Sequence, residues 1–183
     1  MQLPTLKGSR ITIRRLKRSD CESIYVHIKD PRVLRYLPAV PNPYNRDDAR
    51  TWIALTHRKA RRDTAYHFGI EHNQEREIIG GMSFNEVNHH DLDGELGYWL
   101  AHRHWRKGYV SEALRLMLDF AFKELKLRRV YAFVAVSNRP SQALLEKHGF
   151  RREGTLRQSC RMKNRWHDEY LYALLRGEYQ APA

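Results

Sequence analysis

The stretch Gly94-Glu-Leu-Gly-Tyr-Trp-Leu-Ala-His-Arg-His-Trp-Arg-Lys-Gly-Tyr-Val-Ser-Glu-Ala113 decides which fold is expected for this chain. It begins as a strand, passes through a basic loop and enters a helix. Backbone N–H groups at the start of a helix have no intrahelical acceptor, and the helix dipole is positive there. Gly108 has no Cβ to hold a ligand off the main chain, and Arg106 and Lys107 add positive charge. The junction is therefore typical of a pyrophosphate site.

The segments that follow this junction have clear patterns. Apolar residues recur at helical spacing between Tyr109 and Leu125, on a face formed by Val110, Ala113, Leu114, Met117, Leu118, Ala121 and Leu125. Residues 130–136 form a continuous apolar run, which predicts a strand buried on both faces. A short helix is expected over 140–148 and ends at Gly149.

The remaining elements complete a mixed sheet. Strands are expected at 11–16, 65–72, 77–87, 95–101, from 150 onward and at 166–175, with a turn at Lys163-Asn164. Helices are expected from Ser19-Asp20 to Asp30 and from 45 to 62, separated by a proline-rich loop at 38–43. This order predicts an α+β (mixed α/β) fold, and the length of 183 residues fits a single domain over 1–183.

Composition excludes several classes of protein. Hydrophobic residues make up 42% of the chain and charged residues 30%, which is ordinary for a globular protein. No apolar run approaches the roughly 20 residues that cross a bilayer, and the N-terminus has no signal-peptide pattern. Cys21 and Cys160 form no CxxC pair and are expected to be free thiols. We therefore expect a cytoplasmic protein without a membrane partner.

The net charge of +12 has two interpretations. It indicates either a well-solvated basic surface or an anionic partner such as a nucleic acid, the ribosome or a phosphorylated cofactor. The sequence has no RNP-like, helix-turn-helix or zinc pattern, so no specific nucleic-acid recognition is expected. His89-His90 with Asp91 and Asp93 has the spacing of a polar turn, and no metal site is expected.

The segment quoted above resembles a motif of the GNAT superfamily of N-acetyltransferases, Q/R-x-x-G-x-G/A. The matching residues are Trp105-Arg-Lys-Gly-Tyr-Val110. The sequence of residues 105–113 is more similar to the pattern W-G-K-G-Y-A-T-E-A of RimJ/RimL-type ribosomal-protein N-terminal acetyltransferases. Two positions depart from the general pattern: Trp105 stands where many members have Gln or Arg, and Val110 replaces a small residue.

Two further segments carry the same resemblance. Asn138-Arg-Pro-Ser-Gln-Ala-Leu-Leu-Glu-Lys-His-Gly-Phe150 is similar to the family pattern N-x-x-S, a short helix, then K-x-G-F. Asn164-Arg-Trp-His-Asp-Glu-Tyr-Leu-Tyr-Ala173 is similar to the closing hairpin of RimJ/RimL-type enzymes. The resemblance covers nearly the whole chain and is firmest from 77 to 172.

The resemblance implies a GNAT-type sheet of seven strands, mostly antiparallel, with helices on both faces and two parallel strands that splay apart. Acetyl-CoA, as co-substrate and without a metal, is expected to enter the splay. The residues expected to bind it are Leu100, Ala101, His102, Arg106, Lys107, Gly108, Tyr109, Val110, Ser111, Asn138, Ser141 and Lys147. The implied activity is that of an acyltransferase which acetylates a primary amine.

The expected catalytic residues are Glu95, Ser141 and Asn138. An α-ammonium has a pKa of about 8 and a lysine ammonium one of about 10.4, so either must lose a proton before it attacks. Glu95 is the candidate base, although a solvated strand-end acid would look the same. Ser141 is the candidate donor to the leaving sulfur and Asn138 a candidate for positioning, yet both residue types also occur as helix caps. Tyr109 and Tyr172 are candidates for lining the acceptor groove.

The acceptor is expected to be the N-terminal α-amine of a protein or peptide, with ribosomal proteins first in view of the resemblance. A small-molecule amine, such as a polyamine or an aminoglycoside, is the alternative. A non-catalytic module that binds acyl-CoA or RNA is the second alternative. The sequence does not determine the oligomeric state, and a homodimer stays open.

Overall fold

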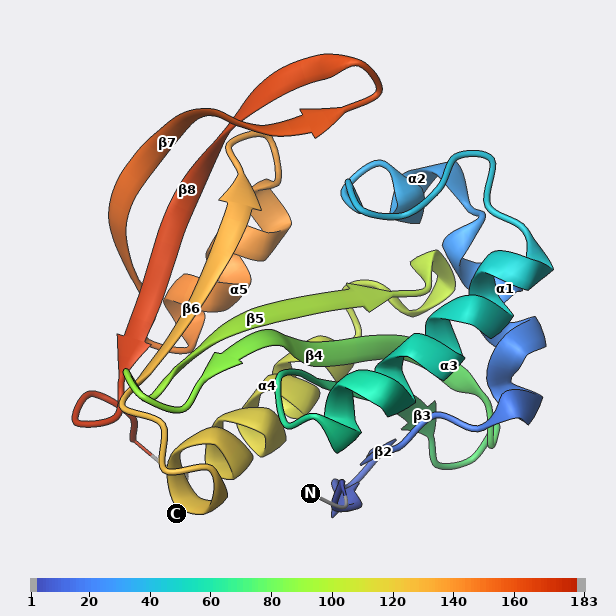
Figure 1. The fold of residues 1–183 in the computed structure, drawn as a ribbon, viewed down its shortest axis with the longest axis horizontal. Helices are drawn as coiled ribbons and strands as arrows, with labels where there is room; N and C mark the ends of the chain where they lie inside the picture. The colour runs from blue at the N-terminus through green and yellow to red at the C-terminus, as the bar shows by residue number, and fades with distance from the viewer. Residues whose placement is uncertain (1–2, 181–183) are drawn as a thin grey trace.

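The computed structural model describes residues 3–180. Eight strands and the helices that cover them follow one another along the chain (Figure 1). The strands are β1 Leu6–Lys7, β2 Ile11–Arg14, β3 Tyr66–His72, β4 Ile78–Asn88, β5 Asp93–Leu100, β6 Arg129–Ala135, β7 Arg151–Met162 and β8 Arg165–Leu175. The helices are η1 Arg18–Asp20, α1 Cys21–Ile28, α2 Pro31–Leu34, α3 Arg46–Arg61, η2 His102–His104, α4 Tyr109–Asp119, η3 Phe120–Glu124 and α5 Arg139–Lys147.

All the described strands belong to one sheet with the order β1-β2-β3-β4-β5-β6-β8-β7. Every neighbouring pair is antiparallel except β5 and β6, which are parallel. The expected α+β class and the splayed parallel pair are confirmed. The sheet has one strand more than the seven expected, because the two-residue β1 pairs with β2.

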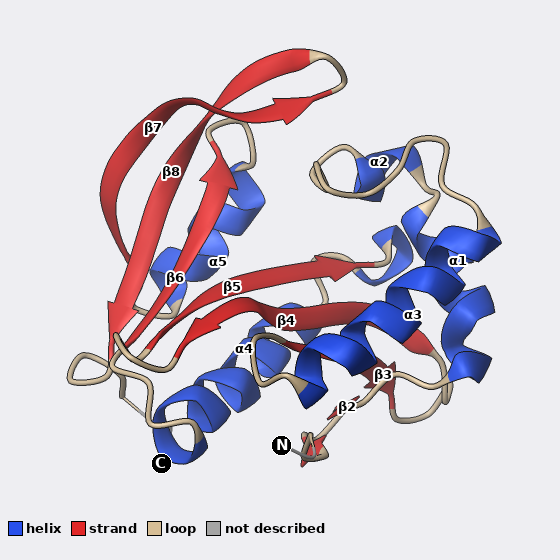
Figure 2. Ribbon diagram, viewed as in Figure 1, coloured by secondary structure: helices blue, strands red, loops and turns tan. Residues whose placement is uncertain are grey.

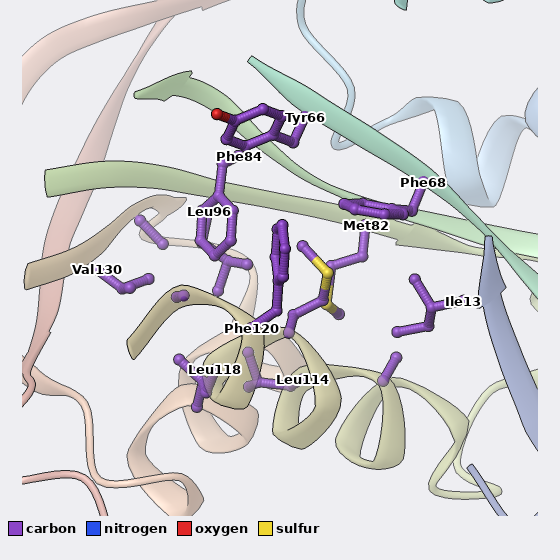
Figure 3. Close-up of a cluster of buried hydrophobic side chains, with 14 of the residues drawn as sticks. Ile13, Tyr66, Phe68, Met82, Phe84, Leu96, Leu114, Leu118, Phe120 and Val130 are labelled. Carbon is purple, nitrogen blue, oxygen red and sulfur yellow. The ribbon is translucent and has the colours of Figure 1, made fainter. Parts of the chain in front are cut away.

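Helices cover both faces of the sheet (Figure 2). One face packs against α4, where Phe68, Phe84 and Phe120 belong to the larger hydrophobic core (Figure 3). The other face packs against α1 and α3 through a smaller core that includes Leu16 and Ile53. Since successive side chains of a strand point to opposite faces, β4 and β5 contribute to both cores, with Ile78 and Trp99 in the smaller one.

Local sequence explains where the main helices begin. Asn45 accepts hydrogen bonds from the amides of Asp47 and Asp48, and Asp48 bonds back to the amide of Asn45, which is a capping box at the start of α3. The N-cap of α4 is Gly108, whose φ of 82° is left-handed and therefore favours glycine. The helical pattern expected to Leu125 is present, but its last part, η3, is a turn of π-helix.

One expectation needs correction, and two short elements were not anticipated. The apolar run of β6 is not buried on both faces: Phe133 is 40% exposed, because β6 loses its neighbour β5 beyond Tyr131. The short helix α2 was not anticipated, although Asp30 caps it and Pro31 occupies its first turn. Strand β1 was not anticipated either, because two residues carry no periodic signal.

Phe120 provides a test of the larger core. Its ring is 1% exposed and meets the rings of Tyr66 and Phe68 edge to face. We expect Phe120→Ala to lower the free energy of unfolding by about 3–5 kcal/mol, because it removes buried contacts and leaves a cavity. Urea denaturation measures the change. The exposed Leu55→Ala should shift it by no more than about 0.5 kcal/mol, and equal effects of the two variants would contradict this account.

Candidate functional site

Strands β5 and β6 part soon after they meet. They are paired only at Asp93–Arg129, Gly94–Val130 and Glu95–Tyr131. Beyond these positions β5 stays bound to β4 as far as Leu100, and β6 stays bound to β8 as far as Ala135. The facing edges of the two strands therefore open into a splay that widens toward the C-terminal end of β5 (Figure 1).

The loop between β5 and α4 lies at the open end of the splay. The amide of Ala101 donates to the carbonyl oxygen of Ile79 at 2.8 Å, so it points toward β4. The indole Nε1 of Trp105 donates to the carbonyl oxygen of Leu100 at 2.8 Å and holds the loop against the end of β5. His102 belongs to the single turn η2 between them and packs on Trp105, with 4.8 Å between ring centroids.

The amides at the start of α4 are not used by the protein. Within residues 3–180, no group accepts a hydrogen bond from the backbone N–H of residues 106–111. The amides on either side are bonded: that of Trp105 to the carbonyl oxygen of His102, and that of Glu112 to the carbonyl oxygen of Gly108. Arg106 and Gly108 both have positive φ, of 61° and 82°, which turns the chain sharply here. Arg106, Lys107 and Gly108 are exposed. The result is a run of outward amides beside two cations, as an anion site requires.

A buried carboxylate fixes this loop from behind. Glu112 is 6% exposed, and its Oε1 accepts from the Arg10 amide at 2.9 Å and from Ser9 Oγ at 3.1 Å. Its Oε2 accepts from Arg10 Nε at 2.9 Å, while Arg10 Nη1 donates to the carbonyl oxygen of Lys107 at 2.8 Å. Burial alone would raise the pKa of Glu112, but these hydrogen bonds outweigh it and hold the pKa below its usual value.

Glycine 8 makes room for that carboxylate. A Cβ on Gly8 would lie 2.4 Å from Glu112 Oε1, so any side chain there would displace the acid. Neither Arg10 nor Glu112 was anticipated as part of the site. Their contact joins residues 102 positions apart, and no local pattern indicates it.

Glu95 lies on the face of the sheet that packs against α1 and α3. A relay of hydrogen bonds orients it: Ser83 Oγ donates to Asn85 Oδ1 at 2.7 Å, and Asn85 Nδ2 donates to Glu95 Oε1 at 2.9 Å. A Cβ on Gly97 would come within 2.6 Å of Asn85 Nδ2, so only glycine lets the amide cross β5. One oxygen of the Glu95 carboxylate is therefore held in place by the relay.

Ser141 lies on the opposite face, at the start of α5. Its Oγ is 2.5 Å from the hydroxyl of Tyr98 on β5. Tyr98 and Glu95 are three positions apart on the strand and so point to opposite faces. Burial raises the pKa of Tyr98 to about 12, despite the opposing effect of the bond to Ser141, so the phenol is neutral at physiological pH. Tyr98 was not anticipated, and nothing in its local spacing marks it.

The other expected residues occupy several positions around the splay. Asn138 is the N-cap residue of α5, but its side chain makes no capping hydrogen bond and is available for another partner. Ser111 Oγ is 2.6 Å from His148 Nε2, which joins the first turn of α4 to the end of α5, beside Lys147. Burial lowers the pKa of His148, as do the charges of Arg115 and Lys147.

The two tyrosines expected to line the acceptor groove both make hydrogen bonds within the protein. Tyr109 Oη is 2.9 Å from His72 Nε2, and its ring packs under the guanidinium of Arg10. Tyr172 is 1% exposed and donates to Glu146 Oε1 at 2.7 Å, so it packs against α5. Tyr131 and Phe133 of β6 lie on the same face of the sheet as Glu95, because they alternate with the core residues Val130, Ala132 and Val134.

The sequence matches the family described as Acetyltransferase (GNAT) domain over residues 10–151. This range contains the splay, the loop before α4 and all of α5.

The chain belongs to the GNAT acetyltransferase family.

Curated relatives of this GNAT chain are named N-acetyltransferases. One is "Uncharacterized N-acetyltransferase p20" of Bacillus licheniformis, 33% identical over 177 residues that cover 97% of this chain and 99% of the relative. Another is the "Ribosomal-protein-serine acetyltransferase" of Escherichia coli, 33% identical over 100 residues that cover 55% of this chain and 56% of the relative. The chain is thus an enzyme, an acyltransferase that transfers acetyl groups.

Solved structures share the fold. A GNAT-family acetyltransferase from Bacillus anthracis superposes with a TM-score of 0.84 at 29% identity, covering 96% of this chain and 100% of that chain. RimL, a ribosomal L7/L12 alpha-N-protein acetyltransferase in complex with coenzyme A, superposes with a TM-score of 0.85 at 20% identity, covering 94% of this chain and 98% of that chain. The RimL likeness concerns the fold alone.

Three further observations concern the described part of this GNAT chain. In the described part of the chain, no three His, Cys, Asp or Glu side chains are grouped as metal ligands. No helix over residues 3–180 combines the length and the apolar character needed to cross a membrane. Cys21 and Cys160 are both free thiols, as expected.

The Glu112 brace yields a pH-dependent prediction. Glu112→Gln would set an amide N–H against the donors of Arg10, and we expect a loss of about 1.5–3 kcal/mol in the free energy of unfolding at neutral pH. Because the folded pKa of Glu112 is lowered, its stabilisation is present above the unfolded pKa of about 4.3 and is lost as pH falls through the folded value. Urea denaturation between pH 7 and pH 3 should therefore show wild type and variant converging. Exposed Glu124→Gln is the control, and a gap that persists at pH 3 would contradict the assignment.

Proposed function

We propose that this GNAT enzyme transfers the acetyl group of acetyl-CoA to the N-terminal α-amine of a protein or peptide. The observation that carries the proposal is the pairing of two open features: the splay between β5 and β6, and the unbonded amides of residues 106–111 at its mouth. A doubly phosphorylated carrier with a long extended arm fits both. Acetyl-CoA is such a carrier, and it supplies the acetyl thioester.

The donor is expected to lie along the loop before α4. The amides of residues 106–111 face its pyrophosphate, with Arg106 and Lys107 adding charge and His102 beside them. Leu100 presents its edge to the splay, since the neighbouring Ala101 amide is turned toward β4. Asn138 and Ser141 lie across the splay on α5, where the thioester end would reach them, and Lys147 lies at the far end of that helix.

Glu95 is proposed as the base. It lies at the last paired position of the splay, on the face opposite the helix α4 that would hold the donor. An α-ammonium that approaches from the α1–α3 side reaches the carboxylate first. The relay from Ser83 through Asn85 keeps one carboxylate oxygen fixed while the proton is taken, directly or through water.

The Ser141–Tyr98 pair is proposed to protonate the leaving sulfur. Tyr98 is neutral at physiological pH because burial raises its pKa to about 12, so it keeps its own proton and orients the Ser141 hydroxyl; the proton that Ser141 gives to the sulfur is replaced from solvent. The two proton transfers thus occur on opposite faces of the sheet. Because Glu95 and Ser141 lie on opposite faces of the sheet, the proposed base and the proposed proton donor do not exchange a proton with each other.

An α-amine is favoured over a lysine side chain or a polyamine because it loses its proton more readily, with a pKa of about 8 against about 10.4. A ribosomal protein is the first candidate because one relative carries the name ribosomal-protein-serine acetyltransferase. We propose that the chain acts as one domain over 1–183 in the cytoplasm, where its free thiols persist.

A side-by-side rate assay tests the acceptor. Free-thiol release with acetyl-CoA should be at least about 10-fold faster in kcat/KM for short peptides with free α-amines than for spermidine or kanamycin. N-terminally blocked peptides that keep a lysine are the control and should react slowly. Faster turnover of the small amines would overturn the peptide assignment, and acetyl-CoA binding without turnover of any amine would replace it with a sensor.

Glu95→Gln tests the base. We expect kcat/KM for the best amine to fall by about 10²-fold or more, because the amine loses its proton acceptor. The affinity for acetyl-CoA, measured by thermal shift, should stay unchanged, since Glu95 lies on the other face of the sheet. Glu124→Gln makes the same chemical change at an exposed site on η3 and should keep full activity. Unaltered turnover in Glu95→Gln would remove Glu95 from this role.

A further inference from the structure

The outer part of the β7–β8 hairpin is a cationic projection, which we define as residues 156–166. It contains Arg157, Arg161, Lys163 and Arg165 and neither Asp nor Glu. Nearly all of β7 is exposed (Figure 1). Among the ion pairs of residues 3–180, none involves these four cations. The projection therefore keeps its full positive charge toward solvent.

The acids nearby on the hairpin are already engaged. Glu153 forms an ion pair with Arg129 at 2.5 Å. Asp168 accepts from the amide of Gln158 at 2.8 Å, and Glu169 accepts from Ser159 Oγ at 2.9 Å. Folding uses the carboxylates to hold the hairpin together and leaves the cations of the projection unpaired.

The projection lies near residues 35–44, the loop that follows α2. We call this loop the α2 segment. Asn42 lines a cavity of about 500 Å³ together with Arg161, Lys163 and Asn164. In Figure 1 the turn of the β7–β8 hairpin and the α2 segment both lie above β5. This α2 segment packs on the same small core as Trp99, that is, on the face of β5 that carries Glu95.

The α2 segment also touches the end of β6. Tyr36 Oη donates to the carbonyl oxygen of Ser137 at 3.5 Å. The cationic projection, the α2 segment and the β6–α5 connection therefore surround the side from which an acceptor would approach Glu95. Two exposed apolar residues belong to the projection, Leu156 at 38% and Trp166 at 59% exposure.

The inner end of this approach has the opposite charge. Glu95 lies opposite Tyr131 in the β5–β6 pairing, and Asp93 lies two residues before Glu95, opposite an Arg129 that is already paired with Glu153. Burial raises the pKa of Tyr131, Asp93, Glu95 and Glu86 raise it further, and Arg129 has a smaller opposing effect. An incoming molecule meets cations at the rim and anions at the reaction centre. That arrangement attracts a positive group inward and a negative group outward.

We infer that the preferred acceptor is the N-terminus of an acidic peptide, whose ammonium group goes to Glu95 and whose acidic side chains bind the cationic projection. An extended peptide covers about 3.3–3.6 Å per residue, so the acids belong a few residues after the amine. A polyamine has the wrong charge for the rim. The inference rests on the proposed peptide function and adds the class of peptide.

Three peptides that differ only in charge test the inference. Each has the same three neutral residues at a free N-terminus, followed by four Glu, four Gln or four Lys. We expect kcat/KM to fall in that order, with about 10-fold between the Glu and Gln peptides at low ionic strength. The Glu-to-Gln ratio should shrink as salt is added, because exposed charges are screened.

Charge removal at the projection provides the variant test. Arg161→Gln/Lys163→Gln should bring the Glu-to-Gln ratio close to 1. Arg58→Gln/Arg61→Gln removes the same charge from the exposed end of α3 and should keep the wild-type ratio. A thermal shift with acetyl-CoA shows that both variants are folded and bind the donor.

Each alternative outcome overturns a different statement. Equal rates for the three peptides, or a ratio unaffected by Arg161→Gln/Lys163→Gln, would remove the acidic-peptide inference and leave the peptide function standing. No turnover of any peptide would end the peptide function and the inference with it. Salt-sensitive binding of a single-stranded oligonucleotide that requires Arg161 and Lys163, with no discrimination between peptides, would reassign the projection to nucleic acid.

Discussion

The site depends on the early end of the parallel pairing between β5 and β6. Each strand is committed on its other side, β5 to β4 and β6 to β8, over nearly its whole length. Neither can bend toward the other without breaking those ladders. An unpaired strand edge inside a sheet costs free energy unless another molecule supplies its hydrogen bonds. The fold therefore keeps open the edge that an extended arm of a substrate can complete.

The proposed anion site at the mouth of the splay depends on a contact made by the start of β2. Arg10 and Glu112 connect the start of β2 to the first turn of α4, and Arg10 also holds the carbonyl oxygen of Lys107. The bond from Arg10 holds the carbonyl oxygen of Lys107 toward the protein. Because the carbonyl is satisfied by the protein, the adjoining amides stay directed outward, where the helix dipole adds to their field.

Much of this architecture could be predicted from the sequence. The helical spacing after Tyr109, the cap at Asn45 and the turn at Lys163-Asn164 are local signals, and the structure contains the elements that they predict. The contacts that complete the site are not local. Tyr98 and Ser141 are 43 positions apart, and Arg10 and Glu112 are 102 apart. Only the folded sheet brings them together, so no spacing rule could find them.

The same limit explains the error at β6. An apolar run is expected to be buried on both faces, yet Phe133 is exposed because the neighbouring strand leaves it. The departure of a neighbour is a property of the whole sheet. The apolar composition of β6 indicates a central strand, but it does not indicate where the neighbouring strand ends.

The relay that ends at Glu95 has a stereochemical consequence. Asn85 donates to Oε1, whereas Oε2 has no partner among residues 3–180. The two oxygens of this carboxylate are therefore inequivalent: one is an anchor and the other carries the available basic lone pairs. In the proposed role of Glu95 as base, the proton is received at the oxygen that makes no hydrogen bond with the described residues, so the relay selects the side of the carboxylate that an amine must reach.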